Sequence, residues 1–373
     1  MKKIRNTRKI REFPRKPARL LVRSTNWIGD AVMTTPAIRT IKENYPDTEI
    51  TLMALPWVSD VFAFCPHVDR IFTYDKEGRH KGLSGKLLLA RDLGREKFDA
   101  AILLQNAFEA ALITTLACIP ARGGYTTDGR GLLLTHGIKK PAGIDQRHQV
   151  HYYQQMLAGL GLRTGPDELE LFVSPQKLHG AQEALADVFS GRGRAPVIGL
   201  NPGAAYGPAK RWPAEKFAEL AKMVHEQTEC LILVFGTKAD NHAASLIQRA
   251  LADRKRCMDL TGSTDLATAI AYIGCCDAFV TNDSGLMHVA AAVDTPLVAL
   301  FGSTDHVATG PHGRRAVVLR KDLPCSPCKK THCPEKHFAC MEKLSAREVC
   351  SSVLTLLEKY YAKDEGKKSG CFS

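Results

Sequence analysis

Short apolar segments alternate with amphipathic helical patterns along most of the chain, and no other feature limits the possible folds as strongly. In the first half, segments with the length and composition of strands lie at 19–23, 49–54, 70–74 and 99–104. The alternation restarts at Pro196, with further apolar segments at 230–235, 278–281 and 297–301. Strands that alternate with helices favour parallel sheets covered on both faces. We therefore expect an α/β fold built from doubly wound sheets.

The length of 373 residues exceeds what one hydrophobic core usually serves, so two domains are expected. The regular pattern breaks between Leu171 and Ala195, where Ser174-Pro175 and a Gly-Arg repeat flank a helical stretch. We predict a basic N-terminal arm at 1–19, one Rossmann-like domain at 20–175, a second at 176–345, and a C-terminal helix and tail at 346–373. Ligands of open parallel sheets bind beyond the carboxyl ends of the strands, so the domains are expected to face each other across a cleft.

Positive charge is concentrated at the N-terminus. The formal net charge is +12, and residues 1–19 hold nine Lys or Arg against one acidic residue, Glu12. Such an arm suits an anionic surface, either membrane head groups or nucleic acid, and a solvated tail has the same composition. The apolar run Leu20–Val22 stops at Arg23, which argues against a secretory signal, and no stretch approaches the roughly 18 apolar residues of a membrane helix. We expect a cytoplasmic protein.

Most of the twelve cysteines lie in apolar surroundings that predict buried thiols, as at Cys230, and indicate a reducing compartment. The exception is a Pro- and Lys-rich segment with the spacing Cys325-x2-Cys328-x4-Cys333-x6-Cys340. This spacing could hold zinc, but it lacks a second Cys-x2-Cys knuckle. Reduced thiols in an ordered loop are the favoured interpretation, and we assign no metal ligand.

The segment from Asn282 to His288 has the features of an anion site, because it connects the apolar strand at 278–281 to an apolar helix. Asp283 or Ser284 can cap that helix, and Gly285 lets the backbone approach a ligand. Backbone N–H groups at the positive end of the helix dipole suit a phosphate, and His288 lies one turn further along. The alternative is an ordinary strand-to-helix turn with a buried histidine.

Two further loops follow predicted strands. After the strand at 19–23, Asp30 lies on a glycine turn, where it is either a general base or a helix cap. After the strand at 196–200, the loop from Asn201 to Pro213 has small residues such as Gly203, which permit close approach of a ligand. Lys210 and its neighbour Arg211 could neutralise a diphosphate, or they could be solvated.

A weaker candidate is Asp240, which follows the strand at 230–235. Acidic residues at this place in nucleotide-binding α/β folds accept hydrogen bonds from ribose hydroxyls. A cap of the helix that begins near Asn241 is the competing interpretation.

Taken together, these loops resemble glycosyltransferase family 9, the lipopolysaccharide heptosyltransferases, over roughly residues 19–355. The resemblance rests on Asn26-Trp27-Ile28-Gly29-Asp30, on Asn201-Pro202-Gly203 through Lys210-Arg211-Trp212-Pro213, on Asn282 to His288, and on Phe301-Gly302-Ser303-Thr304. It implies a GT-B architecture, in which two Rossmann-like domains hold the acceptor in the first and the nucleotide sugar in the second. It also implies that neither a metal nor another cofactor is required.

The resemblance assigns roles position by position. Asp30 corresponds to the family's base and Lys210 to its phosphate-contacting lysine, so these are the expected catalytic residues. Asn26 and Trp27, beside Asp30, are expected at the acceptor. The remaining expected donor-binding residues are Asn201, Gly203, Asp240, Asp283, Ser284, Gly285, Leu286, Met287 and His288, with Asp283 near the sugar and the segment after it along the diphosphate.

The function implied is inverting transfer of L-glycero-D-manno-heptose from ADP-heptose to heptosyl-Kdo-lipid A. The alternatives are a family 9 transferase with a different acceptor, a sugar-nucleotide epimerase of the same architecture, and a non-catalytic protein that binds nucleotide sugars or lipid A. We expect peripheral association with the cytoplasmic face of the inner membrane and no nucleic-acid partner. The basic arm is longer than the family usually has.

Overall fold

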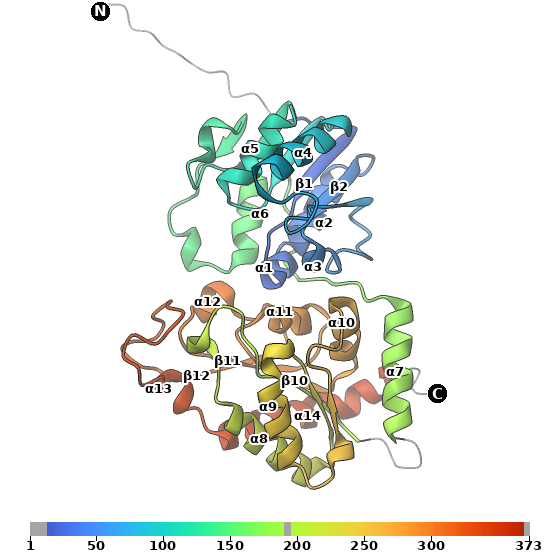
Figure 1. Cartoon of the computed structure of the whole chain (residues 1–373), viewed down its shortest axis with the longest axis vertical. Helices are drawn as coiled ribbons and strands as arrows, with labels where there is room; N and C mark the ends of the chain where they lie inside the picture. The colour runs from blue at the N-terminus through green and yellow to red at the C-terminus, as the bar shows by residue number, and fades with distance from the viewer. Residues whose placement is uncertain (1–12, 190–194, 369–373) are drawn as a thin grey trace, which may run out of the picture. The chain divides into compact units, whose positions relative to one another are not determined.

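The computed structural model describes residues 13–189 and 195–368, and it divides into two compact units between Asp167 and Glu168 (Figure 1). Most of the predicted basic arm and the end of the predicted tail therefore lie outside the described residues. The helix α7 (Pro175–Phe189) packs on α10 (Leu266–Cys275) and so belongs to the second unit. The acceptor and donor roles of the two domains stay a prediction.

The first unit contains a six-stranded sheet in the order β3-β2-β1-β4-β5-β6, and every pairing in it is parallel. Its strands are β1 (Arg19–Arg23), β2 (Glu49–Ala54), β3 (Arg70–Thr73), β4 (Ala100–Leu103), β5 (Ala121–Tyr125) and β6 (His136–Ile138). Its helices are α1 (Ile28–Met33), α2 (Thr35–Asn44), α3 (Pro56–Ser59), α4 (Gly82–Arg95), α5 (Phe108–Leu116) and α6 (Gln149–Gly159).

The second unit repeats this plan with the order β12-β11-β10-β7-β8-β9, again parallel throughout. Its strands are β7 (Val197–Asn201), β8 (Leu231–Val234), β9 (Cys257–Asp259), β10 (Ala278–Asn282), β11 (Leu297–Phe301) and β12 (Ala316–Arg320). Besides α7 and α10, its helices are α8 (Ala214–Thr228), α9 (Asn241–Ala250), α11 (Gly285–Ala292), α12 (His306–Thr309), α13 (Ala339–Glu342) and α14 (Ala346–Lys368).

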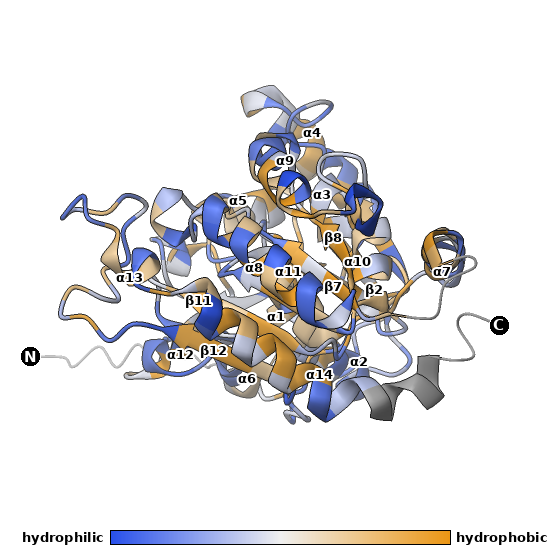
Figure 2. Cartoon of the chain, turned by 90° about the horizontal axis from the view of Figure 1, so that it is seen from below, coloured by the Kyte–Doolittle hydropathy of each residue, from blue (hydrophilic) through white to orange (hydrophobic). Residues whose placement is uncertain are grey.

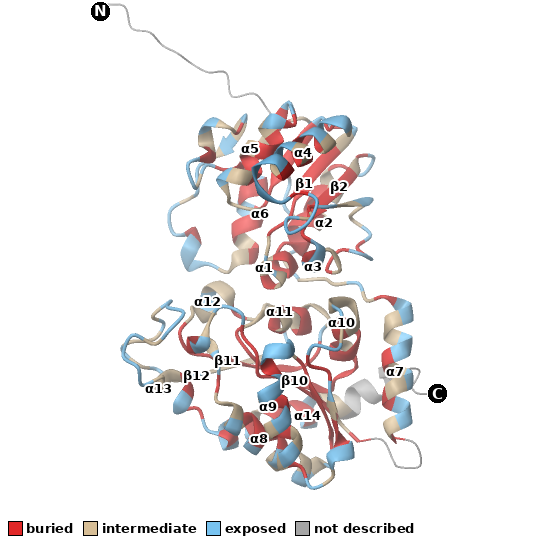
Figure 3. Ribbon diagram, in the orientation of Figure 1, coloured by how far each residue is buried: buried red, intermediate tan, exposed pale blue. Residues whose placement is uncertain are grey.

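Continuous apolar runs explain why these segments form central strands. β4, β7, β8, β10 and β11 are buried along their whole length, as strands covered on both faces must be. Hydrophobic residues are concentrated in the strands (Figure 2), and buried residues fill the centre of each unit (Figure 3). On one face of the second sheet, α8, α9 and α14 share a core that includes Trp212, Phe217 and Val349.

Each sheet reverses its strand order once, and this reversal fixes where a ligand can bind. In the first sheet the reversal lies between β1 and β4, and in the second between β7 and β10. Loops that leave two such strands run to opposite faces of the sheet, so a crevice opens at their carboxyl ends. The prediction of an α/β fold with two Rossmann-like doubly wound domains is confirmed. Among the described residues, none of the helices has both the length and the apolar character that a bilayer span needs.

Gly199 in β7 gives a test of how tightly the second core is packed. A Cβ atom at this position would lie 2.4 Å from Cδ2 of Phe279, whose buried ring packs edge-on against Phe235. We expect Gly199→Ala to destabilise the second unit by about 1–3 kcal/mol, because an overpacked core must shift its side chains. The free energy of the corresponding unfolding transition in urea measures this.

Gly274→Ala is the matched control, since Gly274 lies in α10 with no atom within 4 Å of the added carbon. Alanine should stabilise that helix by roughly 0.5–1 kcal/mol. Equal effects of the two substitutions would contradict the packing described for β7.

Candidate active site

The loop after β1 positions Asp30 in the first turn of α1. Trp27 is the residue that precedes this helix, and its side chain is 63% exposed. Asp30 is half-buried and lies near Tyr153 of α6. Burial raises the pKa of Tyr153 well above its usual value, and the negative charge of Asp30 raises it further. The carboxylate of Asp30 thus lies near a buried tyrosine and three residues after an exposed indole.

A buried arginine shapes this loop. Arg23, the last residue of β1, donates hydrogen bonds to Asn26 Oδ1 (2.7 Å) and to the carbonyl of Ser24 (2.5 Å). Burial lowers the pKa of Arg23 to about 10, while Tyr74 and Glu109 act in the opposite direction. Its guanidinium therefore stays charged at neutral pH and holds Asn26 in place. That Arg23 holds Asn26 was not predicted from the sequence. A charged residue at the end of an apolar strand could have indicated such a role.

A second buried arginine, Arg130, lies in a short 3-10 turn after β5. Arg130 donates to Asn106 Oδ1 (2.6 Å), and Asn106 in turn donates to the hydroxyl of Tyr152 (2.5 Å). The N–H groups of Leu104 and Gln105 bond to the carbonyl of Arg23, so the ends of β4 and β1 are adjacent. This polar cluster was not predicted from the sequence either. In the sequence, the only signal is that Asn106 follows a predicted strand.

In the second unit, the basic loop and the anion motif meet directly. Lys210 Nζ lies 2.6 Å from Oδ2 of Asp283, and Thr304 Oγ1 donates to the same oxygen at 2.6 Å. The side chain of Lys210 is 15% exposed and that of Asp283 is 6% exposed. Residues from the ends of β7, β10 and β11 therefore form one charged cluster. The sequence suggested these residues separately but not their pairing.

Two buried asparagines hold this cluster together. Asn201 Nδ2 donates to Oγ of Ser284 (2.8 Å) and to Oγ1 of Thr281 (2.9 Å). Asn282 accepts a hydrogen bond from the N–H of Trp212 (3.0 Å) and donates to the carbonyl of Pro202 (2.8 Å). The indole N–H of Trp212 bonds to the carbonyl of Leu344 (3.0 Å). Because these contacts are buried, apart from the partly buried one to Ser284, the loop at 201–213 is fixed to the start of α11.

The first turn of α11 has the features of the predicted anion site. Ser284 precedes the helix, but its side chain is engaged by Asn201 and, among the described residues, makes no cap hydrogen bond. Gly285 and Leu286 are partly exposed, whereas Met287 and His288 are buried. Uncapped N–H groups at the positive end of a helix bind phosphate groups well. Lys210 adds a cation at the same edge of the sheet.

Asp240 belongs to the same edge through its contact with Gly203. A Cβ atom on Gly203 would lie 2.7 Å from Oδ2 of Asp240, so only glycine fits there without a shift. The Asp240 carboxylate accepts from the N–H (2.9 Å) and the hydroxyl (3.0 Å) of Thr237. The first of these bonds is half of a capping box at the start of the short 3-10 turn Lys238–Asp240, in which the Thr237 side chain accepts from the backbone N–H of Asp240. Arg211 lies 3.8 Å from its other oxygen. Within the described part of the chain, Asp240 makes no side-chain cap hydrogen bond to α9, so its interpretation as a cap of that helix is wrong, and ribose binding stays a prediction.

The predicted residues thus form two groups. Asn26, Trp27 and Asp30 lie together in the first unit, and the residues predicted to bind the donor lie together in the second. In both units they follow strands at or next to the point where the strand order reverses, and Asp240 follows β8, the neighbour of β7. This arrangement defines a class of protein in which two Rossmann-like units each carry a candidate ligand site.

Comparison with known proteins identifies the family. The model of glycosyltransferase family 9 (heptosyltransferase) matches residues 87–339, a segment that includes both donor loops and begins after Asp30. Lipopolysaccharide heptosyltransferase 2 of Salmonella typhimurium is 33% identical over 311 residues, which cover 81% of this chain and 88% of that protein. Its counterpart in Escherichia coli is 31% identical over 348 residues, covering 91% and 98%. The chain belongs to glycosyltransferase family 9 and is a glycosyltransferase.

Solved structures agree with this assignment. The structure of E. coli ADP-heptose lps heptosyltransferase II superposes with a TM-score of 0.75 at 31% identity, covering 91% of this chain and 99% of that one. A glycosyltransferase family 9 structure from Veillonella parvula gives a TM-score of 0.80 at 26% identity, covering 92% and 98%. The GT-B fold class is therefore confirmed.

Proposed function

We propose that this chain transfers L-glycero-D-manno-heptose from ADP-heptose to a heptose on the Kdo-lipid A inner core, with inversion at the anomeric carbon. The observation that carries the proposal is identity of 31–33% to relatives named lipopolysaccharide heptosyltransferase 2 over most of the chain. The cluster formed by Lys210, Asp283 and the first turn of α11 supports it, since a nucleoside diphosphate needs such a cradle.

The proposed chemistry divides between the two groups of residues. Asp30 accepts the proton of the acceptor hydroxyl, whose oxygen attacks the anomeric carbon from the face opposite the diphosphate. The new carbon–oxygen bond forms as the bond to the diphosphate oxygen breaks, and ADP leaves with the bonding electrons. Lys210 and the N–H groups of Gly285 and Leu286 stabilise the negative charge that develops on ADP. No metal or other cofactor takes part.

The remaining donor-binding residues take supporting roles in this proposal. Asp283 is placed beside the sugar, Asp240 beside the ribose, and Asn201 and Gly203 keep the loop close to the diphosphate. Asn26 and Trp27 hold the acceptor next to Asp30. The exposed indole of Trp27 suits the apolar face of a sugar ring.

We also propose that the protein works in the cytoplasm as a peripheral protein of the inner membrane. The eleven cysteines among the described residues are all free thiols, which fits a reducing compartment. The nine Lys or Arg of residues 1–19 would attract an anionic membrane that carries the lipid acceptor.

An acceptor assay tests the function. Purified protein is mixed with ADP-heptose and with Kdo-lipid A acceptors that bear zero, one or two heptoses, and products are identified by mass. We expect extension of the acceptor with one heptose. Extension of a different acceptor alone would instead indicate another family 9 specificity, an altered sugar without acceptor would indicate an epimerase, and donor binding without any product would indicate a binding protein.

Asp30→Asn tests the assignment of the general base. The substitution keeps the size of the side chain and removes its basicity, so turnover should fall by about 10²- to 10⁴-fold. Donor affinity, measured by ADP titration, should stay unchanged because the donor residues lie in the second unit. Asp47→Asn, at an exposed carboxylate of the first unit, should keep full turnover. Near-normal turnover of Asp30→Asn would exclude Asp30 as the base.

A further inference from the structure

The segment from Lys321 to Phe338, here called the cysteine loop, is the longest irregular stretch between elements of the second unit's described residues. It connects β12 to α13 and contains no helix or strand. Loops of this length inside a compact domain are uncommon and are often functional. Three of its non-glycine residues, Lys329, Lys336 and Phe338, have left-handed backbone angles with φ of 56°, 58° and 44°. Something must hold such a conformation in place.

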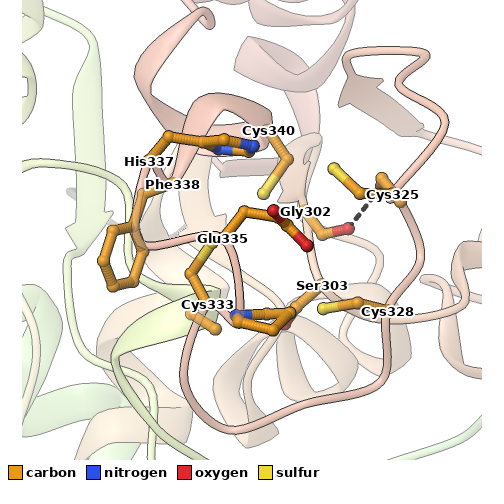
Figure 4. A pocket seen from close by; sticks show the side chains of 12 residues that line it. Gly302, Ser303, Cys325, Cys328, Cys333, Glu335, His337, Phe338 and Cys340 are labelled. Carbon is orange, nitrogen blue, oxygen red and sulfur yellow. Dashed lines mark hydrogen bonds between the residues drawn. The ribbon is translucent and has the colours of Figure 1, made fainter.

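Four thiols surround one small cavity at this loop. Cys325, Cys328, Cys333 and Cys340 all line it, as Figure 4 shows. The cavity holds about 20 Å³, which is room for a single water-sized sphere and not for an organic ligand. Cysteines that converge on a space of this size from one short segment are typical of a bound ion.

A buried hydroxyl in the same cavity lacks a partner. Ser303 is 1% exposed, and its Oγ atom has no hydrogen-bond partner among the described residues. It lines the cavity together with the cysteines. A buried hydroxyl without a partner is costly, and a metal-bound thiolate is a strong acceptor for it. This observation is independent of the thiols and favours an anionic sulfur in the cavity.

We propose that the cysteine loop, together with Cys340 of α13, forms a structural binding site for a thiophilic divalent cation, Zn²⁺ or Fe²⁺, held by Cys325, Cys328, Cys333 and Cys340. On binding, the four thiols release four protons and form four metal–sulfur bonds in tetrahedral geometry. Within the part of the chain that the structure describes, no three potential ligands already meet in metal-binding geometry. Binding of the ion therefore requires the four sulfur atoms to move closer together than they are in this structure.

The site would reinforce the donor loop without taking part in catalysis. The N–H of Ala209 donates to the carbonyl of Thr331 (3.1 Å), and the hydroxyl of Tyr206 donates to the carbonyl of Lys329 (3.2 Å). The N–H of Lys329 in turn donates to the carbonyl of Ser303 (2.6 Å). The cysteine loop thus contacts the turn that carries Lys210. A metal ion that fixes the conformation of the cysteine loop would therefore also fix the conformation of that turn. The metal site does not depend on the proposed heptose transfer.

The test measures metal directly. Protein purified without chelators should contain about one equivalent of zinc or iron per chain by mass spectrometry, as four thiolates bind one ion. Cobalt added to protein stripped of metal should give an intense thiolate-to-cobalt absorption band. The double variant Cys325→Ser/Cys333→Ser should lose both signals, while Cys118→Ser, at an exposed cysteine of the first unit, should keep them.

Negative results are equally clear, because the cobalt spectrum needs no substitution and is read on the folded wild-type chain. Absence of the band, together with four cysteines that stay reactive toward a thiol reagent when zinc is present, would overturn the proposal. A metal content that is unchanged in the double variant would also overturn it. Neither readout uses ADP-heptose, so the result is separate from any failure of the proposed function.

Discussion

The side-chain amide of Asn282 joins the two loops on which the donor site depends. It lies fully buried at the end of β10, accepts from Trp212 and donates to Pro202. Loops that leave adjacent strands at the reversal of a sheet run to opposite faces, so they need such a connection to act as one site. Removing the amide would leave two buried backbone groups without partners, which costs more than the bonds themselves contribute. Lys210 reaches Asp283 because this connection is in place.

The first unit uses the same device with a different residue. Arg23, at the end of β1, bonds to Ser24 and Asn26, and so shapes the turn that leads to Asp30. In both units a buried polar side chain at the end of a central strand satisfies the backbone of the adjacent loop. The loops themselves can then carry small and charged residues that add little to the core. Repetition of one fold therefore produces two sites of different chemistry, one with a carboxylate and one with a cation and uncapped N–H groups.

Much of this could be predicted from the sequence, because continuous apolar runs mark central strands. The segment Arg19–Arg23 was predicted as a strand and forms β1. β5 was not predicted, since Gly123 and Gly124 weaken its pattern, and the need for Gly123 arises from Leu160, where a Cβ atom would meet the side chain at 2.8 Å. The candidate donor residues were recognisable by type. Their pairing, and the burial of Arg23, depend on contacts between distant segments that no local pattern reports.

Titration of ADP into the intact chain tests the central claim most directly, namely that the second unit holds a diphosphate cradle centred on Lys210. The lysine can make a charge-assisted hydrogen bond worth about 1.5–3 kcal/mol, so Lys210→Ala should raise the Kd at least about tenfold. Lys222→Ala, which removes an exposed lysine of α8, should leave the Kd unchanged. An equal Kd for the wild type and Lys210→Ala would contradict the account.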